Sequence, residues 1–423
     1  MDIALTKLQN GVRVLSVKRQ DSMTATVMVL VKVGSRYEDP MHSGIAHFVE
    51  HMFFKGTEKR PTSKDIGMAI EKIGGSSNAF TGQDFTGYYI KVPKENFAVS
   101  IEILADMIKH GIFQQNEIDK ERGVIIEEIR MYEDRPMSKV GSEWYKEYFG
   151  DSPLGRDIAG SIDTVSSFNK EHFHDFVNTH YVGDSILVVV SGGVSEQDAT
   201  GLVKEHFSDV QKGERSKFEK YSREERTPAV KNLYKPIEQS HLLLGGYAHN
   251  RNYENRFVLE LADAVLSKGF GSRLFQVIRD ELGLAYYIYS SITSFEDVGV
   301  FKVGMGVENS KVAIAVEAVL KEMRAIISGE FDNDELERAK NYLLGNMVTD
   351  MEQSDDNAMW YGLQELLTDK FYTVEDVKNI IMGISKEDIV REMNTVIAGQ
   401  NLLLASVTPH QSLPDGIADQ LHI

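Results

Sequence analysis

The feature that most constrains the fold of this chain is an internal repeat that divides its 423 residues into two similar halves. The segment FNKEHFHDFVNTHYVGDSILVVVSG begins at Phe168, and ISKEDIVREMNTVIAGQNLLLASVT begins at Ile384. Both contain Lys-Glu, then Asn-Thr, then an apolar strand pattern. The pair Glu121-Arg122 recurs at residues 337–338, at the same offset as between these two segments. A shared offset at two distant places indicates an internal duplication, with one related domain built from each copy.

The order of apolar patterns within each half predicts an α+β fold. Alternating strand patterns such as FTGYYIKV and VGVFKVGMGV precede a long helix rich in Ile, Leu and Ala, and a second long acidic helix follows. Strands separated by paired helices indicate helices packed on one face of a largely antiparallel sheet. The charged segment QKGERSKFEKYSREERTPAV indicates a linker between the halves. We therefore predict a first domain over residues 1–212, a linker over 213–230 and a homologous domain over 231–423.

The composition excludes several classes of function. With 64 acidic against 46 basic residues the net charge is −18, which argues against a nucleic-acid partner, because a phosphate backbone needs a basic face. The chain has no cysteine, so any zinc must be held by histidine and carboxylate side chains. The most apolar early run, TATVMVLVKVG, is broken by Lys32 and is too short to span a membrane, and no signal-peptide pattern is visible. We expect a cytoplasmic protein without a membrane partner, although a leader already removed would leave the same sequence.

The short stretch AHFVEHMF, residues 46–53, has the spacing of a metal site. A helix places residues i, i+3 and i+4 on one face, so His47, Glu50 and His51 project together. Two imidazoles at this spacing can ligate one cation, and the carboxylate beside them can orient and deprotonate a bound water. Such a histidine pair with its acid arises by chance about 0.05 times in a chain of this composition. Two surface histidines therefore remain the alternative on the motif alone.

A zinc site needs a third protein ligand, and the acidic helix predicted over NEIDKERGVIIEEIRMYEDR offers candidates. Glu117, Glu121 and Glu128 are spaced by four and seven residues, which places them on one helix face. Glu127 turns roughly 100° away from Glu128. The apolar residues from Val124 onward indicate that parts of this helix are buried, and a buried carboxylate favours a cation. A solvated acidic face is the alternative.

The duplication provides a test of the joint site. At the offset that relates the two copies, Glu128 corresponds to Leu344, and positions 262–269 contain no histidine pair. The candidate ligands are therefore missing together from the second copy, while the surrounding pattern persists. This favours one metal site, in the first half only.

Taken together, these residues give the sequence a resemblance to the pitrilysin (insulinase-like) family of zinc peptidases, whose inverted signature is His-x-x-Glu-His. The resemblance covers essentially the whole chain, and HFVEHMFFKGTEKRP is most similar to the processing-peptidase branch. The family's third ligand is a glutamate at the end of a pattern similar to ERGVIIEE, residues 121–128, in which Glu127 is the nearest competitor. The resemblance implies one zinc ion per chain held by His47, His51 and Glu128, with Glu50 as general base and Glu121 as a supporting glutamate.

A second stretch, GGSSNAFTGQDFTGYY, resembles the family's edge strand that pairs with the backbone of the substrate. The resemblance implies that main-chain hydrogen bonds hold an extended peptide there, beside Asn78, Ala79 and Phe80. An ordinary hairpin strand is the alternative.

In the second half, SRLFQVIRDELGLAYYIYS is similar to a family segment whose Arg and Tyr bind the substrate or the oxyanion. The matching residues are Arg279 and Tyr286, with Tyr287 as a close alternative. Family peptidases close a chamber from four half-units and this chain has two, so the resemblance implies a homodimer.

The predicted function is zinc-dependent endopeptidase activity, with Glu50 as general base, on peptides or unfolded short polypeptides inside a closed chamber. A non-catalytic structural or partner-binding subunit of the same fold is one alternative, and a zinc hydrolase of other substrates is another. Neither the cleavage preference nor the metal used in the cell follows from these residues, because two histidines and a glutamate also accept manganese or cobalt.

Overall fold

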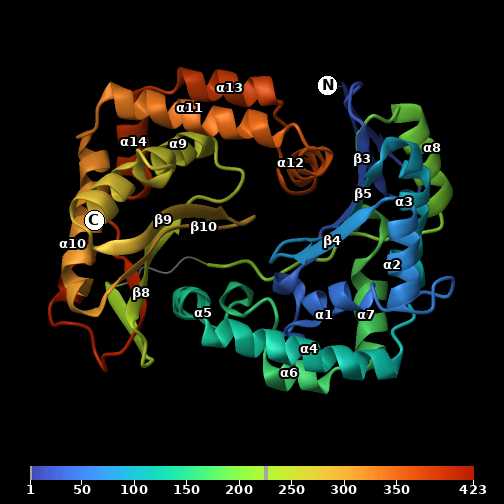
Figure 1. Cartoon of the computed structure of the whole chain (residues 1–423), viewed down its shortest axis with the longest axis horizontal. Coiled ribbons are helices and arrows are strands. Elements are labelled where there is room, and N and C mark those ends of the chain that lie inside the picture. The colour runs from blue at the N-terminus through green and yellow to red at the C-terminus, as the bar shows by residue number, and fades with distance from the viewer. Residues whose placement is uncertain (1, 223–226) are drawn as a thin grey trace. The chain divides into compact units, whose positions relative to one another are not determined.

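The computed structural model of the chain describes residues 2–222 and 227–423, so residues 223–226 of the predicted linker lie outside the described part. The chain forms two compact units, and each contains segments from both halves of the sequence (Figure 1). Unit 1 comprises Met1–Met131, Ser152–Glu219 and Asp350–Phe371. Unit 2 comprises Tyr132–Asp151, Lys220–Thr349 and Tyr372–Ile423.

Unit 1 is built on a six-stranded sheet with the strand order β1-β2-β6-β3-β5-β4. β2 and β6 run parallel, and the other neighbouring pairs are antiparallel. β3 and β6 are rich in Val and almost wholly buried, as expected for strands covered on both faces. The strands span Asp2–Lys7 (β1), Arg13–Lys18 (β2), Thr24–Val31 (β3), Ser76–Thr81 (β4), Thr86–Pro93 (β5) and Ile186–Gly192 (β6).

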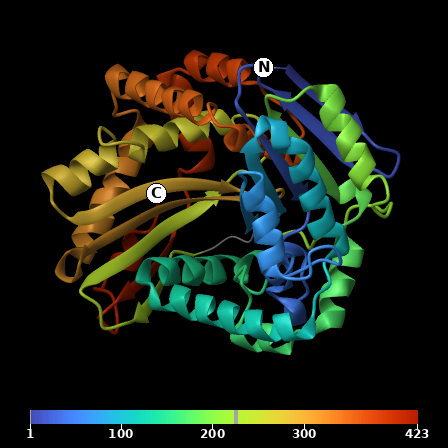
Figure 2. The same ribbon diagram turned by 45° about the vertical axis from the view of Figure 1, so that its right-hand side comes forward.

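Helices of the first half cover one face of this sheet. The odd-numbered residues Val27, Val29 and Val31 of β3 lie in a core that also contains Phe48 and Ile101 from two of these helices. Figure 2 shows α2 and α3, in blue and cyan, side by side. The helices of the first half assigned wholly or mostly to unit 1 are α1 (Ile45–Met52), α2 (Ser63–Lys72), α3 (Phe97–His110), α4 (Gln115–Asp134), α6 (Ile162–Ser167), α7 (Lys170–His180) and α8 (Glu196–Phe207).

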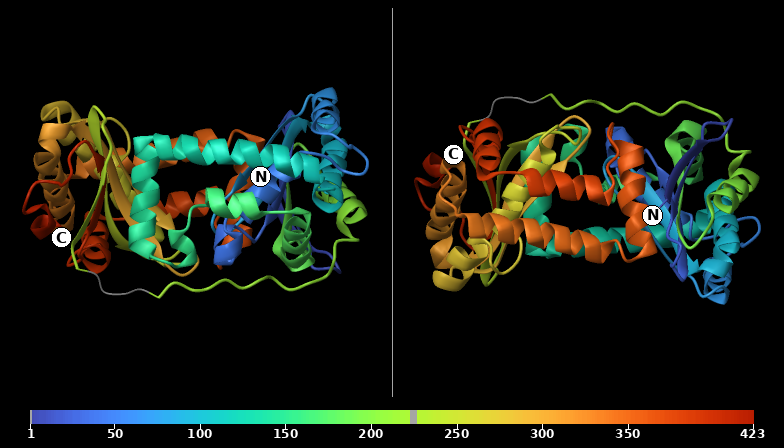
Figure 3. Two further views of the ribbon diagram at one scale, coloured as in Figure 1. Left: turned by 90° about the horizontal axis from the view of Figure 1, so that it is seen from below. Right: turned by 90° about the horizontal axis from the view of Figure 1, so that it is seen from above.

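The opposite face of the same sheet is covered by α12 (Ser354–Leu367), which comes from the second half of the sequence. The even-numbered residues of β3 meet it, because successive side chains of a strand point to opposite faces. Gly362 approaches the sheet so closely that a Cβ there would lie 2.7 Å from Leu30 Cδ1. At the start of the helix, Ser354 Oγ lies 2.8 Å from Thr26 Oγ1. Figure 3 (right) shows this helix, in orange, along the blue strands of unit 1.

Unit 2 is built on a five-stranded sheet with the order β7-β11-β8-β10-β9. This order repeats β2-β6-β3-β5-β4 of unit 1, including the parallel pair at the same place. The strands span Ala229–Tyr234 (β7), Gln239–Ala248 (β8), Ala285–Ser294 (β9), Gly299–Glu308 (β10) and Leu403–Thr408 (β11). The helices of the second half that belong wholly or mostly to unit 2 are α9 (Arg256–Ser267), α10 (Val312–Ser328), α11 (Asn333–Asp350), α13 (Val374–Gly383), α14 (Lys386–Val396) and α15 (Ile417–Gln420).

The first half contributes α5 (Pro136–Phe149) to unit 2, where it packs on β8 and β11. Trp144 of α5 is completely buried, and its Nε1 donates a hydrogen bond of 3.1 Å to the carbonyl of Leu403. Lys302 in β10 donates a bond of 2.6 Å to the hydroxyl of Tyr145 from the same helix. The two halves therefore exchange one helix each.

These features confirm the predicted α+β class and the duplication. The offset between the repeated sequence segments also relates the start of β2 to that of β7, and the start of α7 to that of α14. The only two tryptophans of the chain, Trp144 in α5 and Trp360 in α12, are separated by the same offset. The exchange was not anticipated, because the predicted layers placed helices of one half on one face of their own sheet.

Within the described residues, no helix has the length and apolarity needed to cross a membrane.

Candidate active site

Helix α1 holds the histidine pair, and its position is set from inside unit 1. Phe48, Val49 and Met52 are buried in the core, which turns the side of the helix that carries residues 47, 50 and 51 away from it. Gly44, directly before the helix, has φ +97°, a left-handed conformation that favours glycine.

The carboxylate of Glu38 replaces a conventional side-chain cap at the start of α1. Its two oxygens accept hydrogen bonds from the backbone N–H groups of Gly44 (2.9 Å) and Ala46 (2.8 Å). Glu38 is 6% exposed, and burial raises its pKa to about 8, against the two backbone hydrogen bonds, which lower it. Glu38 thus ties the loop before α1 to the first turn of the helix that carries the histidines.

The structure brings His47, His51 and Glu128 together as a group that could hold a metal ion, with their ligand atoms within 4.8 Å of one another. The Nε2 atoms of His47 and His51 lie 3.2 Å apart, and Glu128 Oε2, from α4, lies 3.9 Å and 3.8 Å from them. Zinc bonds of about 2.0–2.1 Å at tetrahedral angles separate two ligand atoms by about 3.3 to 3.4 Å. The two imidazoles are within about 0.2 Å of this spacing, and a shift of about half an ångström would bring the carboxylate to it.

His47 has the protonation state that a metal ligand needs. Burial, and then the neighbouring His51, lower its pKa to about 4, so the imidazole is neutral at neutral pH. Its Nδ1 is buried and has no hydrogen-bond partner among residues 2–222 and 227–423. His47 is therefore oriented by the packing of α1.

His51, by contrast, is held from behind by a carboxylate. Its Nδ1 lies 2.9 Å from Glu121 Oε1, which directs the free Nε2 lone pair towards His47 and Glu128. The second oxygen of Glu121 lies 2.6 Å from Nζ of Lys55. Burial raises the pKa of Glu121, but the hydrogen bonds from His51 and Lys55 outweigh it and leave the pKa below its usual value. Lys55 was not among the residues predicted from the sequence.

Glu50 is fixed by a contact from strand β4. The hydroxyl of Thr81, the last residue of β4, donates a hydrogen bond to Glu50 Oε2. Burial raises the pKa of Glu50. The Thr81 hydrogen bond and His51 lower it, while the charge of Glu128 raises it further. Glu50 is thus a carboxylate of raised basicity that interacts electrostatically with two of the candidate ligands.

The other acids of α4 lie outside this group. Glu127 is 69% exposed and pairs with Arg130, so the nearest competitor of Glu128 points into solvent. Glu117 pairs with Lys120 at 2.6 Å. The apolar residues of the helix differ in exposure: Ile125 is buried, whereas Val124 is 52% exposed.

The predicted substrate strand is β4, which forms one edge of the unit 1 sheet. Asn78 is exposed, and Ala79 and Phe80 are half-buried. The ring of Phe80 lies across Gly87 of β5, where a Cβ would be 2.1 Å from it. β4 also contacts α1, so the predicted peptide-binding edge and the histidine helix are neighbours.

Arg279 and Tyr286 lie in unit 2, on either side of the turn between a π-helix (Phe275–Glu281) and β9. The guanidinium of Arg279 is 5.9 Å from the ring centre of Tyr286, which is 72% exposed. Tyr287 is half-buried, and its hydroxyl lies 2.8 Å from His241 Nδ1. Of the two tyrosines, Tyr286 is therefore the one available to a ligand beside Arg279.

The second copy of the motif helix has a different polar network. Asp263 lies at the position of His47, and Ser267 at that of His51. Lys268 Nζ is 2.9 Å from Asp263, and Ser290 donates its hydroxyl to Asp263 and its backbone N–H to Ser267 Oγ. An ammonium group therefore neutralises the carboxylate, and no further group of three potential ligands occurs in the described part of the chain.

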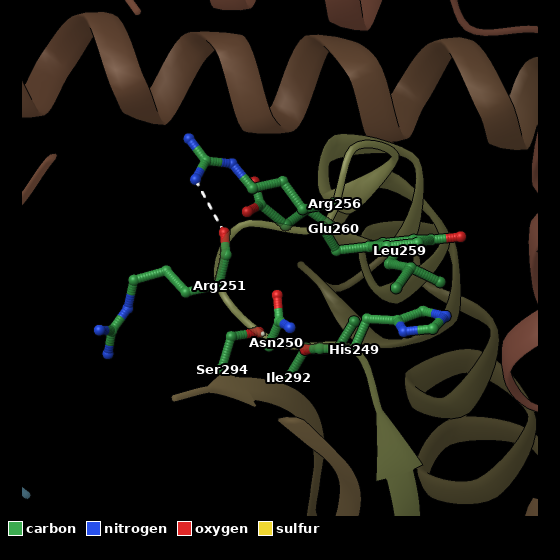
Figure 4. A pocket seen from close by; sticks show the side chains of 9 residues that line it. His249, Asn250, Arg251, Arg256, Leu259, Glu260, Ile292 and Ser294 are labelled. Atoms are coloured by element: carbon green, nitrogen blue, oxygen red, sulfur yellow. Dashed lines mark hydrogen bonds between the residues drawn. The ribbon is translucent and has the colours of Figure 1, made fainter. Parts of the chain in front are cut away.

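Unit 2 also contains a cavity of about 170 Å³ beside the start of α9. Arg256 donates a hydrogen bond of 3.1 Å to the carbonyl of Arg251 at its rim (Figure 4). Its wall is formed by His249, Asn250, Arg251, Tyr253, Arg256, Leu259, Glu260, Ile292 and Ser294. We assign the candidate active site to the histidine pair in unit 1, because only there do three potential ligands of a metal ion come together among the described residues.

Comparison with known proteins gives the family. Residues 13–161 match the family described as Insulinase (Peptidase family M16), and residues 167–343 match the Peptidase M16 inactive domain. An "Uncharacterized zinc protease YmxG" of Bacillus subtilis is 31% identical over 411 residues, which cover 96% of this chain and 98% of the relative. An "Uncharacterized zinc protease" of Rickettsia felis is 34% identical over 401 residues, which cover 93% and 95%.

Solved structures agree in fold. The crystal structure of a protease from Helicobacter pylori has a TM-score of 0.91 at 22% identity and covers 96% of this chain and 99% of its own. An M16 inactive domain from Pseudomonas fluorescens has a TM-score of 0.91 at 17% identity, with 98% and 100% covered. The chain belongs to the M16 peptidase family, which confirms the resemblance seen in the sequence, and its curated relatives are zinc proteases of the same half-size type.

Proposed function

We propose that this protein is a zinc-dependent endopeptidase that cleaves peptides or unfolded short polypeptides. The observation that carries the proposal is the group formed by His47, His51 and Glu128, with Glu50 on the same helix as the histidines. In a protein without cysteine, two imidazoles and one carboxylate form the ligand set of a catalytic zinc site with an open position. A zinc ion held there would lower the pKa of a water molecule and polarise the scissile carbonyl.

The residues around this group have distinct roles in the proposed reaction. Glu50 accepts a proton from the attacking water and later delivers it to the leaving amine, and its raised pKa suits both steps. Glu121 holds His51 in the tautomer whose Nε2 is free to bind the metal. The Thr81 hydroxyl keeps the Glu50 carboxylate in place.

Substrate binding is proposed at β4, where an extended peptide would add to the free edge of the unit 1 sheet beside Asn78, Ala79 and Phe80. Arg279 and Tyr286 are proposed to bind the substrate or the oxyanion, and a homodimer would supply them to the partner's site. An exposed arginine and tyrosine side by side suit recognition of a peptide carbonyl or carboxylate.

Metal analysis together with digestion of a random peptide mixture tests the proposal. The purified protein should contain about one zinc per chain and should cut the mixture, and a chelator should abolish cleavage. The Glu50→Gln variant should keep its zinc and lose cleavage by at least about 10²-fold, because general acid–base catalysis contributes 10² to 10⁴-fold.

The outcomes separate three classes of function. A protein without bound metal and without activity would be a structural or partner-binding subunit of the same fold. Bound zinc with no peptide cleavage would indicate a hydrolase of other substrates. Full activity in Glu50→Gln would refute the role assigned to that residue, even if the wild type is a zinc peptidase.

A further inference from the structure

A chain of three side chains leads away from the proposed metal. Nζ of Lys55 lies 2.6 Å from Glu121 Oε2, and Glu121 Oε1 lies 2.9 Å from His51 Nδ1. We propose that Lys55 is a positioning residue that acts through Glu121 to hold His51 and Glu128 at metal-binding distance. This inference rests on the metal site of the proposed function, but it concerns how that site is assembled.

The ion pair connects the two helices that supply every proposed ligand. Lys55 follows α1 by one turn, and its backbone N–H donates to the carbonyl of Met52 at 3.0 Å, so its main chain is fixed to the end of the histidine helix. Glu121 lies on α4, seven residues before Glu128 and on the same face. The contact from Lys55 to Glu121 therefore ties α1 to α4 beside the ligands, whether or not a metal is bound.

Glu121 needs this second partner because it is buried. It is 6% exposed, and a buried carboxylate is costly unless hydrogen bonds and an opposite charge satisfy it. His51 occupies only one of its oxygens. With Lys55 on the other oxygen, the carboxylate is held at both ends and cannot rotate towards a cation as a rival ligand to Glu128.

The charges at the site agree with this role. Glu50, Glu121 and Glu128 bring three negative charges around the two imidazoles when all three acids are ionised. Lys55 is the one lysine or arginine in ion-pair contact with any of these acids within residues 2–222 and 227–423. The positive charge of Lys55 offsets one of the three negative charges, and a divalent cation would neutralise the remaining two.

The chain contains a matched control four residues further on. Lys59 pairs with Glu102 at 2.7 Å, and its side chain is 62% exposed. Lys59→Met removes a lysine from the same segment and breaks an ion pair to the same kind of residue. That pair touches none of the proposed ligands.

The test measures how fast zinc is released, which does not depend on peptidase activity. In the first measurement, zinc-loaded protein is mixed with an excess of a chromophoric chelator, whose absorption follows the release of zinc. In a second measurement, the visible absorption of the Co²⁺-loaded protein reports the ligand geometry. Loss of a residue that supports a ligand typically weakens metal binding by about 10 to 100-fold. Lys55→Met should accelerate zinc release by about 10-fold or more and change the Co²⁺ spectrum, while Lys55→Arg and Lys59→Met should stay within about threefold of the wild type.

A double-mutant cycle tests whether Lys55 acts through Glu121. In the Glu121→Gln background, Lys55→Met should change the release rate by less than about twofold, since residues in one network are not additive. Additive effects, or an unchanged rate in Lys55→Met, would overturn the proposal. Lys55→Gln serves as the second variant if Lys55→Met does not fold.

Failure of this inference is distinct from failure of the proposed function. A wild type that binds zinc tightly but cuts no peptide would refute the peptidase and leave the release-rate comparison intact. If the protein is a peptidase but releases zinc at the same rate in the wild type and in Lys55→Met, only the positioning role is refuted. A wild type that binds no zinc would overturn both.

Discussion

The exchange of helices between the halves predicts that a substitution in the first half destabilises unit 2. Trp144 of α5 is completely buried there, stacks on Tyr148 with ring centres 4.5 Å apart, and donates its N–H to the carbonyl of Leu403. Replacing a buried tryptophan with alanine costs about 3 to 5 kcal/mol, through lost burial and the cavity that remains. For Trp144→Ala we expect about 4 kcal/mol, which is roughly a thousandfold increase in the population of opened unit 2.

Hydrogen exchange followed by mass spectrometry locates this effect along the chain. Under native conditions, amides of β8 and β11 should exchange roughly a thousandfold faster in Trp144→Ala, because these strands contact α5 and open with it. Amides of β3 and β5, in unit 1, should change far less. Trp360→Ala is the corresponding substitution in α12; because Trp360 is only half-buried, it should loosen β3 instead, and by less. Faster exchange confined to β3 and β5 in Trp144→Ala would refute the assignment of α5 to unit 2.

Two further predictions concern the candidate site. Thr81→Val removes the hydrogen bond to Glu50 and should lower kcat for peptide cleavage about 10-fold, with KM within about twofold of the wild type, because a hydrogen bond to a charged group contributes about 1.5 to 3 kcal/mol. Thr81→Ser keeps the hydroxyl and should keep the kcat of the wild type. Steady-state kinetics decide, and an unchanged kcat in the valine variant would contradict the role of Thr81. Because the folded protein raises the pKa of Glu38 from 4.5 to about 8, the stability contributed by its bound proton is full below pH 4.5 and is lost as the pH rises to 8. In urea denaturation of the metal-free protein, the free energy of unfolding of the wild type should therefore fall by on the order of 4 kcal/mol relative to that of Glu38→Gln between pH 5 and 9. If the two proteins lose stability in parallel over this range, the pKa of Glu38 is not raised in the folded protein.

Much of the fold and of the candidate site could be predicted from local patterns. The constant offset between repeated segments predicted two related units, and helical spacing predicted that His47, Glu50 and His51 share a face. The same periodicity placed Glu121 and Glu128 on one side of α4 and turned Glu127 away, as the structure has them. These inferences succeed because the geometry of a single helix follows from its own residues.

The residues that hold the site together were harder to find. Lys55 and Thr81 come from a turn and from a strand end, where no periodicity marks which carboxylate they reach. A signal for the exchanged helices did exist, since the Trp-Tyr pair at 144–145 recurs at 360–361. It marks corresponding helices but does not say which sheet each one covers.

The sequence by itself determined the duplicated α+β plan and the helical spacing of the candidate metal ligands, which it places in the first half. Only the tertiary structure decided that α5 and α12 change places and that Lys55 ties α1 to α4 through Glu121. The physical reason is that an apolar stripe specifies which face of a helix is buried, not which surface buries it. That choice depends on close fits between distant segments, such as Gly362 against Leu30, and these exist only once the chain is folded.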